Sequence, residues 1–126
     1  MNREAYLVMM KIKNFRDLAV WQLGKEIVLQ AYRVTKGFPR EELYGLVSQM
    51  RRAAVSIPSN VAEGLNRKHN PEFRQALYVI LGSCAELETY VELAYELGFM
   101  TVRDRAQMIE GLDHESRMLR NLLKHL

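Results

Sequence analysis

The sequence predicts an all-α protein, a single up-down-up-down antiparallel four-helix bundle. Apolar residues recur at intervals of three and four along four long segments, which is the spacing of one buried face on a helix. The chain has only three prolines and seven glycines among its 126 residues, which favours long uninterrupted elements. Short turns separate the segments, as in antiparallel bundles. We expect helices near residues 14–37, 40–66, 71–98 and 102–124, and no strand.

The first helix has recognisable signals at both ends. Asn14 or Asp17 can cap its start, because a short polar side chain there accepts a hydrogen bond from a free backbone N–H. Gly37 follows its last turn as a terminator. Phe38 and Pro39 then make the corner that leads to the second helix.

The second helix carries two stripes. Its apolar stripe, meant for the core, holds Leu43, Leu46, Val47, Met50, Ala54, Ile57, Val61 and Leu65. Its polar stripe, spaced three and four residues apart, holds Gln49, Arg52, Ser56, Asn60, Glu63 and Arg67. Short and amide side chains suit a close contact with another helix or subunit, built on hydrogen bonds. A solvated face with accidental order and a catalytic row are the alternatives.

Pro58 lies inside this helix, where it removes the N–H that would bond the carbonyl of Ala54. The apolar stripe keeps its phase on both sides, which predicts a bend near Ala54–Pro58 and not a break. Gly64 is either a point of close contact or the beginning of the helix end.

The third and fourth helices are bounded by a glycine and a cap. Gly98 ends the third, and Thr101 with Asp104 has the spacing of a capping box before the fourth. The third helix has a regular seam of Phe73, Leu77, Ile80, Cys84, Leu87, Val91 and Ala94. The fourth is expected to bury Val102, Ala106, Ile109, Leu112, Ser116, Leu119, Leu123 and Leu126.

Composition and charge are those of an ordinary globular domain. Hydrophobic residues make up 48% and charged residues 26% of the chain. We interpret residues 1–10 as a flexible N-terminal extension, with Met10 as a second candidate start, and residues 11–126 as the bundle domain. The single cysteine fits a reducing compartment, so we expect a cytoplasmic protein. No apolar run approaches the roughly 18 residues of a membrane span.

The net charge of +3 is unevenly placed. Residues 1–60 hold ten Lys or Arg against five Asp or Glu, and residues 61–126 hold eight against ten. A modest basic excess permits contact with nucleic acid without establishing it. Arg51 and Arg52 form the only adjacent pair of arginines.

The sequence contains few residues in patterns typical of catalytic or metal sites. Glu110 and His114 are four residues apart, but residues 113–115 read as a solvated stretch. Cys84 lies on an apolar seam, where a cysteine is a small core residue. The sequence has no phosphate-binding glycine loop and no nucleophile elbow. We therefore expect no enzyme, no catalytic residue, no cofactor and no metal site.

The segment from Glu42 to Gly64, ELYGLVSQMRRAAVSIPSNVAEG, resembles the signature of a bacterial family encoded in intervening sequences of 23S ribosomal RNA genes. Phe15–Trp21, Phe38-Pro39, and Leu97 to Phe99 resemble its other landmarks. The resemblance implies a four-helix bundle that assembles into a homopentamer and has no assigned activity. It also implies kinship with accessory variability proteins of diversity-generating retroelements, which are basic pentamers that bind nucleic acid and a reverse transcriptase.

Two functions stay open at this point. The first is a non-enzymatic homo-oligomer that binds RNA, DNA or a nucleoprotein, with Arg51, Arg52 and Arg67 as candidates for phosphate contact. The second is a protein-interaction scaffold without nucleic acid. The candidate contact or oligomer interface consists of Gln49, Arg52, Ser56, Pro58, Asn60, Glu63 and Gly64. Glutamates such as Glu63, Glu86 and Glu88 compete with phosphate for the arginines.

Overall fold

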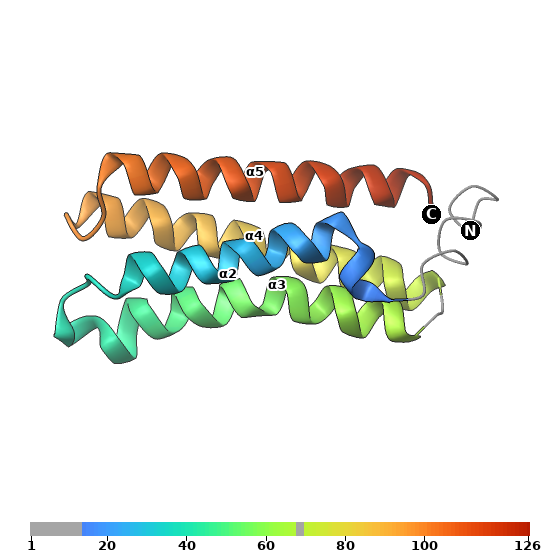
Figure 1. Ribbon diagram of the computed structural model, residues 1–126, viewed down its shortest axis with the longest axis horizontal. Coiled ribbons are helices and arrows are strands. Elements are labelled where there is room, and N and C mark those ends of the chain that lie inside the picture. Colours follow the sequence, from blue (N-terminus) through green and yellow to red (C-terminus); the bar gives the residue numbers. More distant parts are fainter. Residues whose placement is uncertain (1–13, 68–69) are drawn as a thin grey trace.

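A computed structural model describes residues 14–67 and 70–126, and within them every regular element is helical. Three short turns are η1 (Phe15–Asp17), η2 (Arg40–Glu42) and η3 (Leu43–Val47), and the long helices are α2 (Ala19–Thr35), α3 (Ser48–Arg67), α4 (Asn70–Glu96) and α5 (Val102–Lys124). The predicted all-α class with four main helices is confirmed (Figure 1). The predicted extension, residues 1–10, lies outside the described residues.

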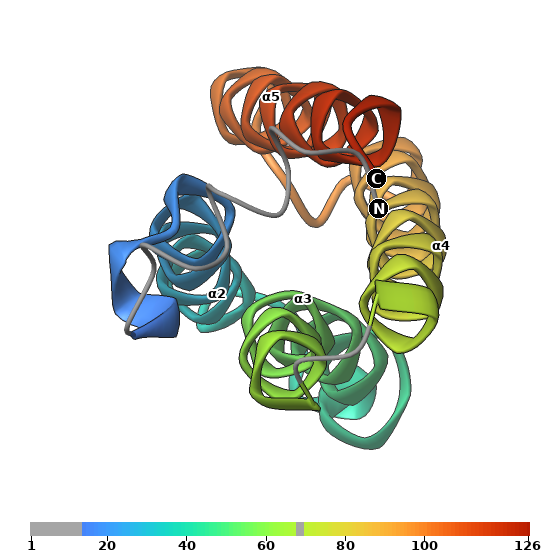
Figure 2. The same cartoon turned by 90° about the vertical axis from the view of Figure 1, so that its right-hand side faces the viewer.

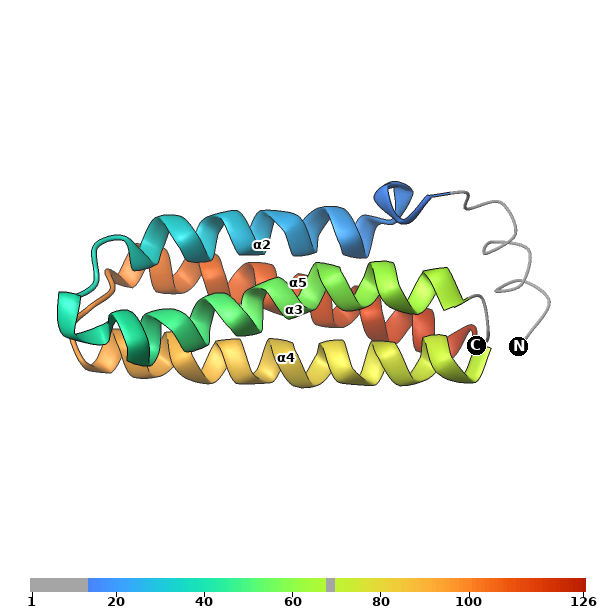
Figure 3. The ribbon, with the colours of Figure 1, turned by 90° about the horizontal axis from the view of Figure 1, so that it is seen from below.

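Consecutive helices run side by side in opposite directions, as the colours along the ribbons show (Figure 1 and Figure 3). Seen from one end, they follow one another round the bundle in the order α2, α3, α4, α5 (Figure 2). Helix α3 packs against α2 and α4, and α5 closes the circle against α4 and α2. We refer to α2 and α3 as one half of the bundle and to α4 and α5 as the other.

The first long helix begins later than predicted. Asn14 does cap a turn, since its Oδ1 accepts a hydrogen bond of 2.9 Å from the N–H of Arg16, but this turn is η1. Leu18 is then extended, with φ −80° and ψ 129°, and α2 starts at Ala19. The predicted start at residue 14 is wrong because one extended residue separates the capped 3-10 turn from the α-helix.

The second long helix also has an irregular start, although the sequence predicts one helix from residue 40. The chain first forms the 3-10 turn η2 and the π turn η3, in which Gly45 has φ −110° and ψ −110°. A π turn winds more widely than an α-helix, so its side chains leave the phase of the helix that follows. Leu43 is consequently exposed, although the predicted apolar stripe includes it, whereas Val47 is buried.

Helix α3 continues through Pro58 without a break, as predicted. The proline has no N–H to donate to the carbonyl of Ala54, and side chains after it donate to the next two carbonyls of this turn. Ser59 Oγ donates to the carbonyl of Val55 at 2.8 Å, and Asn60 Nδ2 donates to that of Ser56 at 2.7 Å. The predicted bend of the helix axis stays a prediction.

A glycine on α2 lets this helix approach α3 closely beside the proline. A Cβ atom at Gly24 would lie 3.1 Å from Cγ2 of Ile57 and 3.4 Å from Cβ of Pro58. Both distances are at or below ordinary van der Waals contact. The two helices of this half are therefore packed tightly at the middle of α3.

Helix α4 ends at Glu96, two residues before the predicted boundary. Gly98 has φ +80°, a left-handed conformation that favours glycine. The N–H of Phe99 donates to the carbonyl of Ala94 at 2.9 Å, the hydrogen bond of a glycine-terminated helix. The seam predicted for α4 is buried throughout: Phe73, Leu77, Ile80, Cys84, Leu87, Val91 and Ala94.

Helix α5 begins at its predicted cap. Thr101 Oγ1 accepts a hydrogen bond of 3.0 Å from the N–H of Asp104. The carboxylate of Asp104 contacts Arg33 of α2 at 3.3 Å, so this cap also lies beside the other half of the bundle. The bounds of α5 agree with the predicted range 102–124.

Candidate functional site

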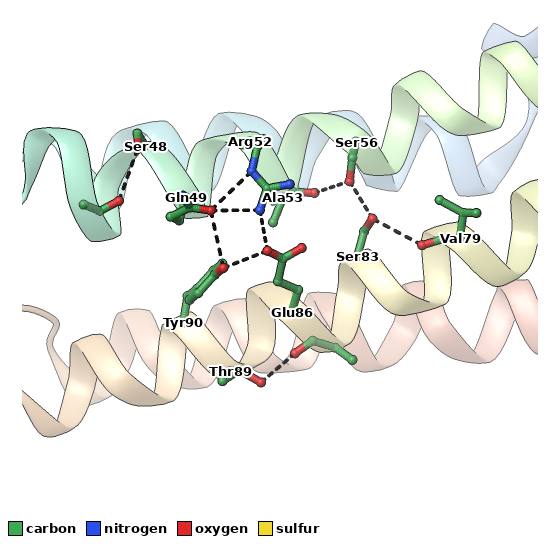
Figure 4. A network of polar contacts seen from close by, with 12 residues as sticks. Ser48, Gln49, Arg52, Ala53, Ser56, Val79, Ser83, Glu86, Thr89 and Tyr90 are labelled. Carbon is green, nitrogen blue, oxygen red and sulfur yellow. Dashed lines mark hydrogen bonds and ion pairs between the residues drawn. The ribbon is translucent and has the colours of Figure 1, made fainter.

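The first part of the polar stripe forms a hydrogen-bond network between α3 and α4 (Figure 4). Arg52 Nη2 donates to Gln49 Oε1 at 2.8 Å and forms an ion pair with Glu86 of α4. The hydroxyl of Tyr90 donates to the same carboxylate at 2.7 Å. This hydrogen bond, together with Arg52, lowers the pKa of Glu86. The same hydrogen bond to Glu86 raises the pKa of Tyr90, and Arg52 opposes that rise. The network joins the outer edges of the two helices.

Ser56 extends the contact towards the middle of the bundle. Its hydroxyl oxygen lies 2.6 Å from that of Ser83 on α4 and 2.7 Å from the carbonyl of Ala53 (Figure 4). Ser83 Oγ also lies 3.2 Å from the carbonyl of Val79. The hydrogen bonds that the sequence predicts for this stripe thus join two helices of one chain.

The far end of the stripe consists of an ion pair and a close contact. Arg67 Nη2 donates to Glu63 Oε1 at 2.8 Å along α3, and this hydrogen bond raises the pKa of Arg67. A Cβ atom at Gly64 would lie 2.6 Å from the Cβ of Ala76 on α4. Gly64 is therefore a point of close contact, one of its two predicted roles. These residues and Asn60 border a groove of about 390 Å³.

The three candidate phosphate-binding arginines have different surroundings. Arg51 faces α2, where its Nε donates to Thr35 Oγ1 at 2.9 Å and its guanidinium lies 4.5 Å from the ring centre of Tyr32. Arg52 faces α4 and Arg67 lies at the other end of α3, each paired with a glutamate. Two of the three arginines, Arg52 and Arg67, are thus already paired with a carboxylate within the chain.

Arg51 and Arg52 nevertheless border one groove of about 490 Å³ on the outside of α2, η3 and α3. We call it the Tyr44 groove and define it by its lining: Tyr32, Leu43, Tyr44, Val47, Ser48, Arg51, Arg52 and Val55. The side chain of Tyr44 is 91% exposed. Sequence reasoning missed this groove because the π turn, which follows no side-chain pattern, places Leu43 and Tyr44 at the surface.

Glu115 of α5 is a second feature that sequence reasoning missed. Residues 113–115 read as a solvated stretch, but the Glu115 side chain is fully buried, and within the described residues neither carboxylate oxygen has a hydrogen-bond partner. Burial raises the pKa of Glu115 to about 8. Its spacing of three from Leu112 and four to Leu119 is that of a core position, and this is the signal that could have found it.

The predicted seam of α5 needs correction for the same reason. The buried residues are Met108, Leu112, Glu115 and Leu119, whereas Val102 and Ala106 are exposed. The fourth helix is thus rotated slightly from the expected orientation. Glu115 points into the core where Ser116 was the expected core residue.

Cys84 lies on the buried seam of α4, as predicted. Burial raises the pKa of its thiol to about 12, so very little thiolate exists at neutral pH. Among residues 14–67 and 70–126, no group of three or more His, Cys, Asp or Glu side chains could hold a metal ion. Within the same two ranges, no helix has both the length and the apolar character needed to cross a bilayer.

The comparisons with known proteins support a family assignment. The family described as 23S rRNA-intervening sequence protein matches residues 16–121, which is most of the chain. No curated protein matches the sequence. The matched range includes α2, α3 and α4 completely and most of α5, so the likeness covers the whole bundle. The chain belongs to the 23S rRNA-intervening sequence protein family.

Proposed function

We propose that the protein is a non-enzymatic homo-oligomer, most simply the homopentamer that the signature segment implies, which acts in the cytoplasm and binds RNA weakly without sequence preference. The observation that carries the oligomer is the set of large hydrophobic side chains left exposed on one chain: Leu29, Tyr32, Leu43, Tyr44, Val55, Tyr78, Val79, Leu93, Leu97 and Val102. Four of them, Tyr32, Leu43, Tyr44 and Val55, line one groove, and a contiguous exposed apolar surface marks an interaction site.

RNA binding is supported by the distribution of charge. Residues 19–67, which form the α2–α3 half, hold seven Lys or Arg and four Asp or Glu. A cyclic oligomer repeats this basic half around its axis. Because each phosphate contact adds to affinity and to its salt dependence, repeated weak contacts give a measurable total. Arg51, Arg52 and Arg67 are the candidates for phosphate contact, and Arg52 and Arg67 also have carboxylate partners within the chain.

The second candidate function is a protein-interaction scaffold without nucleic acid. It is favoured by the ion pairs of Arg52 with Glu86 and of Arg67 with Glu63, which reduce the charge available for phosphate. In this case the exposed apolar side chains contact protein alone.

The test measures mass and RNA affinity together. Light scattering at micromolar concentration should give a multiple of the 14.7 kDa chain mass. A fluorescent single-stranded RNA should bind at low salt and dissociate as salt rises. The double variant Arg51→Ala/Arg52→Ala should weaken binding more than Arg103→Ala/Arg117→Ala, which removes the same charge from exposed positions of α5.

Each result separates the candidates. A wild-type protein that binds no RNA at low salt, yet remains oligomeric, leaves the scaffold as the function. A monomer of 14.7 kDa contradicts both.

A further inference from the structure

The two halves of the bundle present unlike apolar surfaces. Five of the exposed large hydrophobic side chains belong to the α2–α3 half, and five belong to α4, the turn after it, and the start of α5. The first five include four that line the Tyr44 groove. On the other half, Leu93 and Leu97 are one helical turn apart and form an exposed apolar edge at the end of α4. One surface is thus a groove, and the other is an exposed helix edge.

The two halves also carry opposite charge. Residues 19–67 have seven basic and four acidic side chains, whereas residues 70–126 have six basic and nine acidic ones. Attraction between unlike halves of neighbouring molecules is therefore favoured, and contact between like halves is opposed.

Charge complementarity extends to the two apolar surfaces themselves. In the Tyr44 groove, Arg51 uses its Nε for Thr35, and among the described residues neither of its Nη atoms has an acceptor. Beside the apolar edge, Glu96 is exposed and has no ion pair within the described part of the chain. Glu92, one turn earlier, is occupied by Arg105 at 2.9 Å. The groove thus contains the guanidinium of Arg51, and the edge lies beside the carboxylate of Glu96.

Both surfaces lie at the same end of the bundle. The segment Arg40–Val47 and the connection from α4 to α5 both lie at the left-hand end of Figure 1. If two copies stand side by side and point the same way, the groove of one is level with the edge of the next. A contact between two different surfaces is heterologous, and its repetition produces a closed ring when the rotation between neighbouring copies closes, or a helical filament when it does not.

We propose that copies of this chain assemble head to tail, with the Tyr44 groove of one copy receiving the Leu93–Leu97 edge of the next and Arg51 facing Glu96. This arrangement rests on the proposed homo-oligomer and specifies its interface. It buries the exposed Tyr44 ring against aliphatic side chains and gives Arg51 a carboxylate partner. Arg51 then has no donors left for phosphate, and RNA contact in the ring rests on the other basic side chains of the α2–α3 half. Every copy uses both surfaces once.

Site-directed cross-linking tests the pairing of surfaces. Ser48→Cys places a thiol in the groove without removing an apolar side chain, and Leu97→Cys places one on the edge. The two variants are mixed, allowed to exchange subunits, and treated with a short bis-maleimide. Native Cys84 does not compete, because it is buried and its thiol is almost fully protonated. Tyr78→Cys, exposed near the opposite end of α4, replaces Leu97→Cys in the control mixture.

The expected result is a cross-linked dimer in the mixture of Ser48→Cys with Leu97→Cys and none in either variant alone or in the control mixture. Cross-linking of Ser48→Cys with itself means that groove meets groove and overturns the proposal. An oligomer by light scattering without any cross-link also overturns it but leaves the proposed oligomer intact. A wild-type monomer overturns both.

Charge reversal gives a second, independent measurement. Arg51→Glu and Glu96→Arg should each reduce oligomer mass at moderate salt, because each places like charges at the contact. The double variant Arg51→Glu/Glu96→Arg should restore the mass. If the double variant is dissociated while circular dichroism shows the bundle folded, Arg51 does not face Glu96 and the proposed register is wrong.

Discussion

Gly64 of α3 approaches Ala76 of α4 so closely that a Cβ atom on the glycine would lie 2.6 Å from the Cβ of the alanine. Neither methyl group can rotate away, so Gly64→Ala should force the two helices apart. We expect a loss of roughly 1–3 kcal/mol in the free energy of unfolding, the usual cost of overpacking. Urea denaturation measures it.

Gly82→Ala is the matched control for this prediction. A Cβ atom at Gly82 would meet no other atom within 4 Å, although Gly82 lies in the interior of α4 just as Gly64 lies in the interior of α3. We expect a gain of about 0.5–1 kcal/mol from the better helix propensity of alanine. Equal effects of the two substitutions would contradict the close contact at Gly64.

The second prediction concerns the pH dependence of stability. The pKa of Glu115 is about 8 in the folded chain and about 4.3 in an unfolded one. Between these values the unfolded chain binds fewer protons than the folded chain, so stability falls as pH rises from about 4 to about 8. The expected loss is on the order of a few kcal/mol. Urea unfolding at several pH values measures the slope.

Substitution of Glu115 should change that slope. Glu115→Leu removes the buried acid and should be more stable than the wild type at pH 8, with a smaller pH dependence between pH 5 and 8. Glu110→Gln, at an exposed position on the same helix, should retain the wild-type slope. An unchanged slope in Glu115→Leu would show that another group controls the pH dependence.

The third prediction concerns the reactivity of Cys84. Because the thiol is buried and its pKa is raised to about 12, a thiol reagent such as 5,5′-dithiobis(2-nitrobenzoic acid) should react very slowly with the folded protein at pH 8. Reaction should become fast in denaturant. Rapid stoichiometric labelling of the native protein would contradict the position of Cys84 in the core.

The fourth prediction concerns the start of α5. Thr101→Ala removes the side-chain oxygen that accepts the N–H of Asp104, and we expect it to cost about 1 kcal/mol. Thr101→Ser keeps the acceptor and should restore most of that stability. Thermal unfolding of the three proteins, followed by circular dichroism, provides the comparison.

The sequence predicts the regular parts of this fold well. The α4 seam from Phe73 to Ala94 follows a heptad, and a heptad determines which face is buried. The sequence does not predict η3, because the π turn at Gly45 depends on how the corner packs and not on local periodicity. It also leads to the wrong environment for Glu115, because carboxylates are rarely buried without a partner, although its spacing is that of a core residue.

Only part of the candidate site could be predicted from the sequence. The spacing of Gln49, Arg52 and Ser56 predicts a shared face and a contact built on hydrogen bonds, and the chain makes that contact with α4. Glu86 was a foreseeable partner because α4 is rich in glutamate. The Tyr44 groove was not foreseeable, since it combines α2 with the irregular start of α3 and needs the tertiary structure to appear.

The Tyr44 groove depends on the one extra residue that the π turn contains. Each hydrogen bond of a π turn spans one residue more than a bond of an α-helix, so removal of Gly45 would allow α winding to continue to the corner. Every residue before the deletion would then turn by about 100° around the axis of α3. Leu43 and Tyr44 would leave Arg51 and Val55, while the core from Val47 onwards would keep its place. A chain one residue shorter at this position would thus fold into the same bundle with a different outer surface.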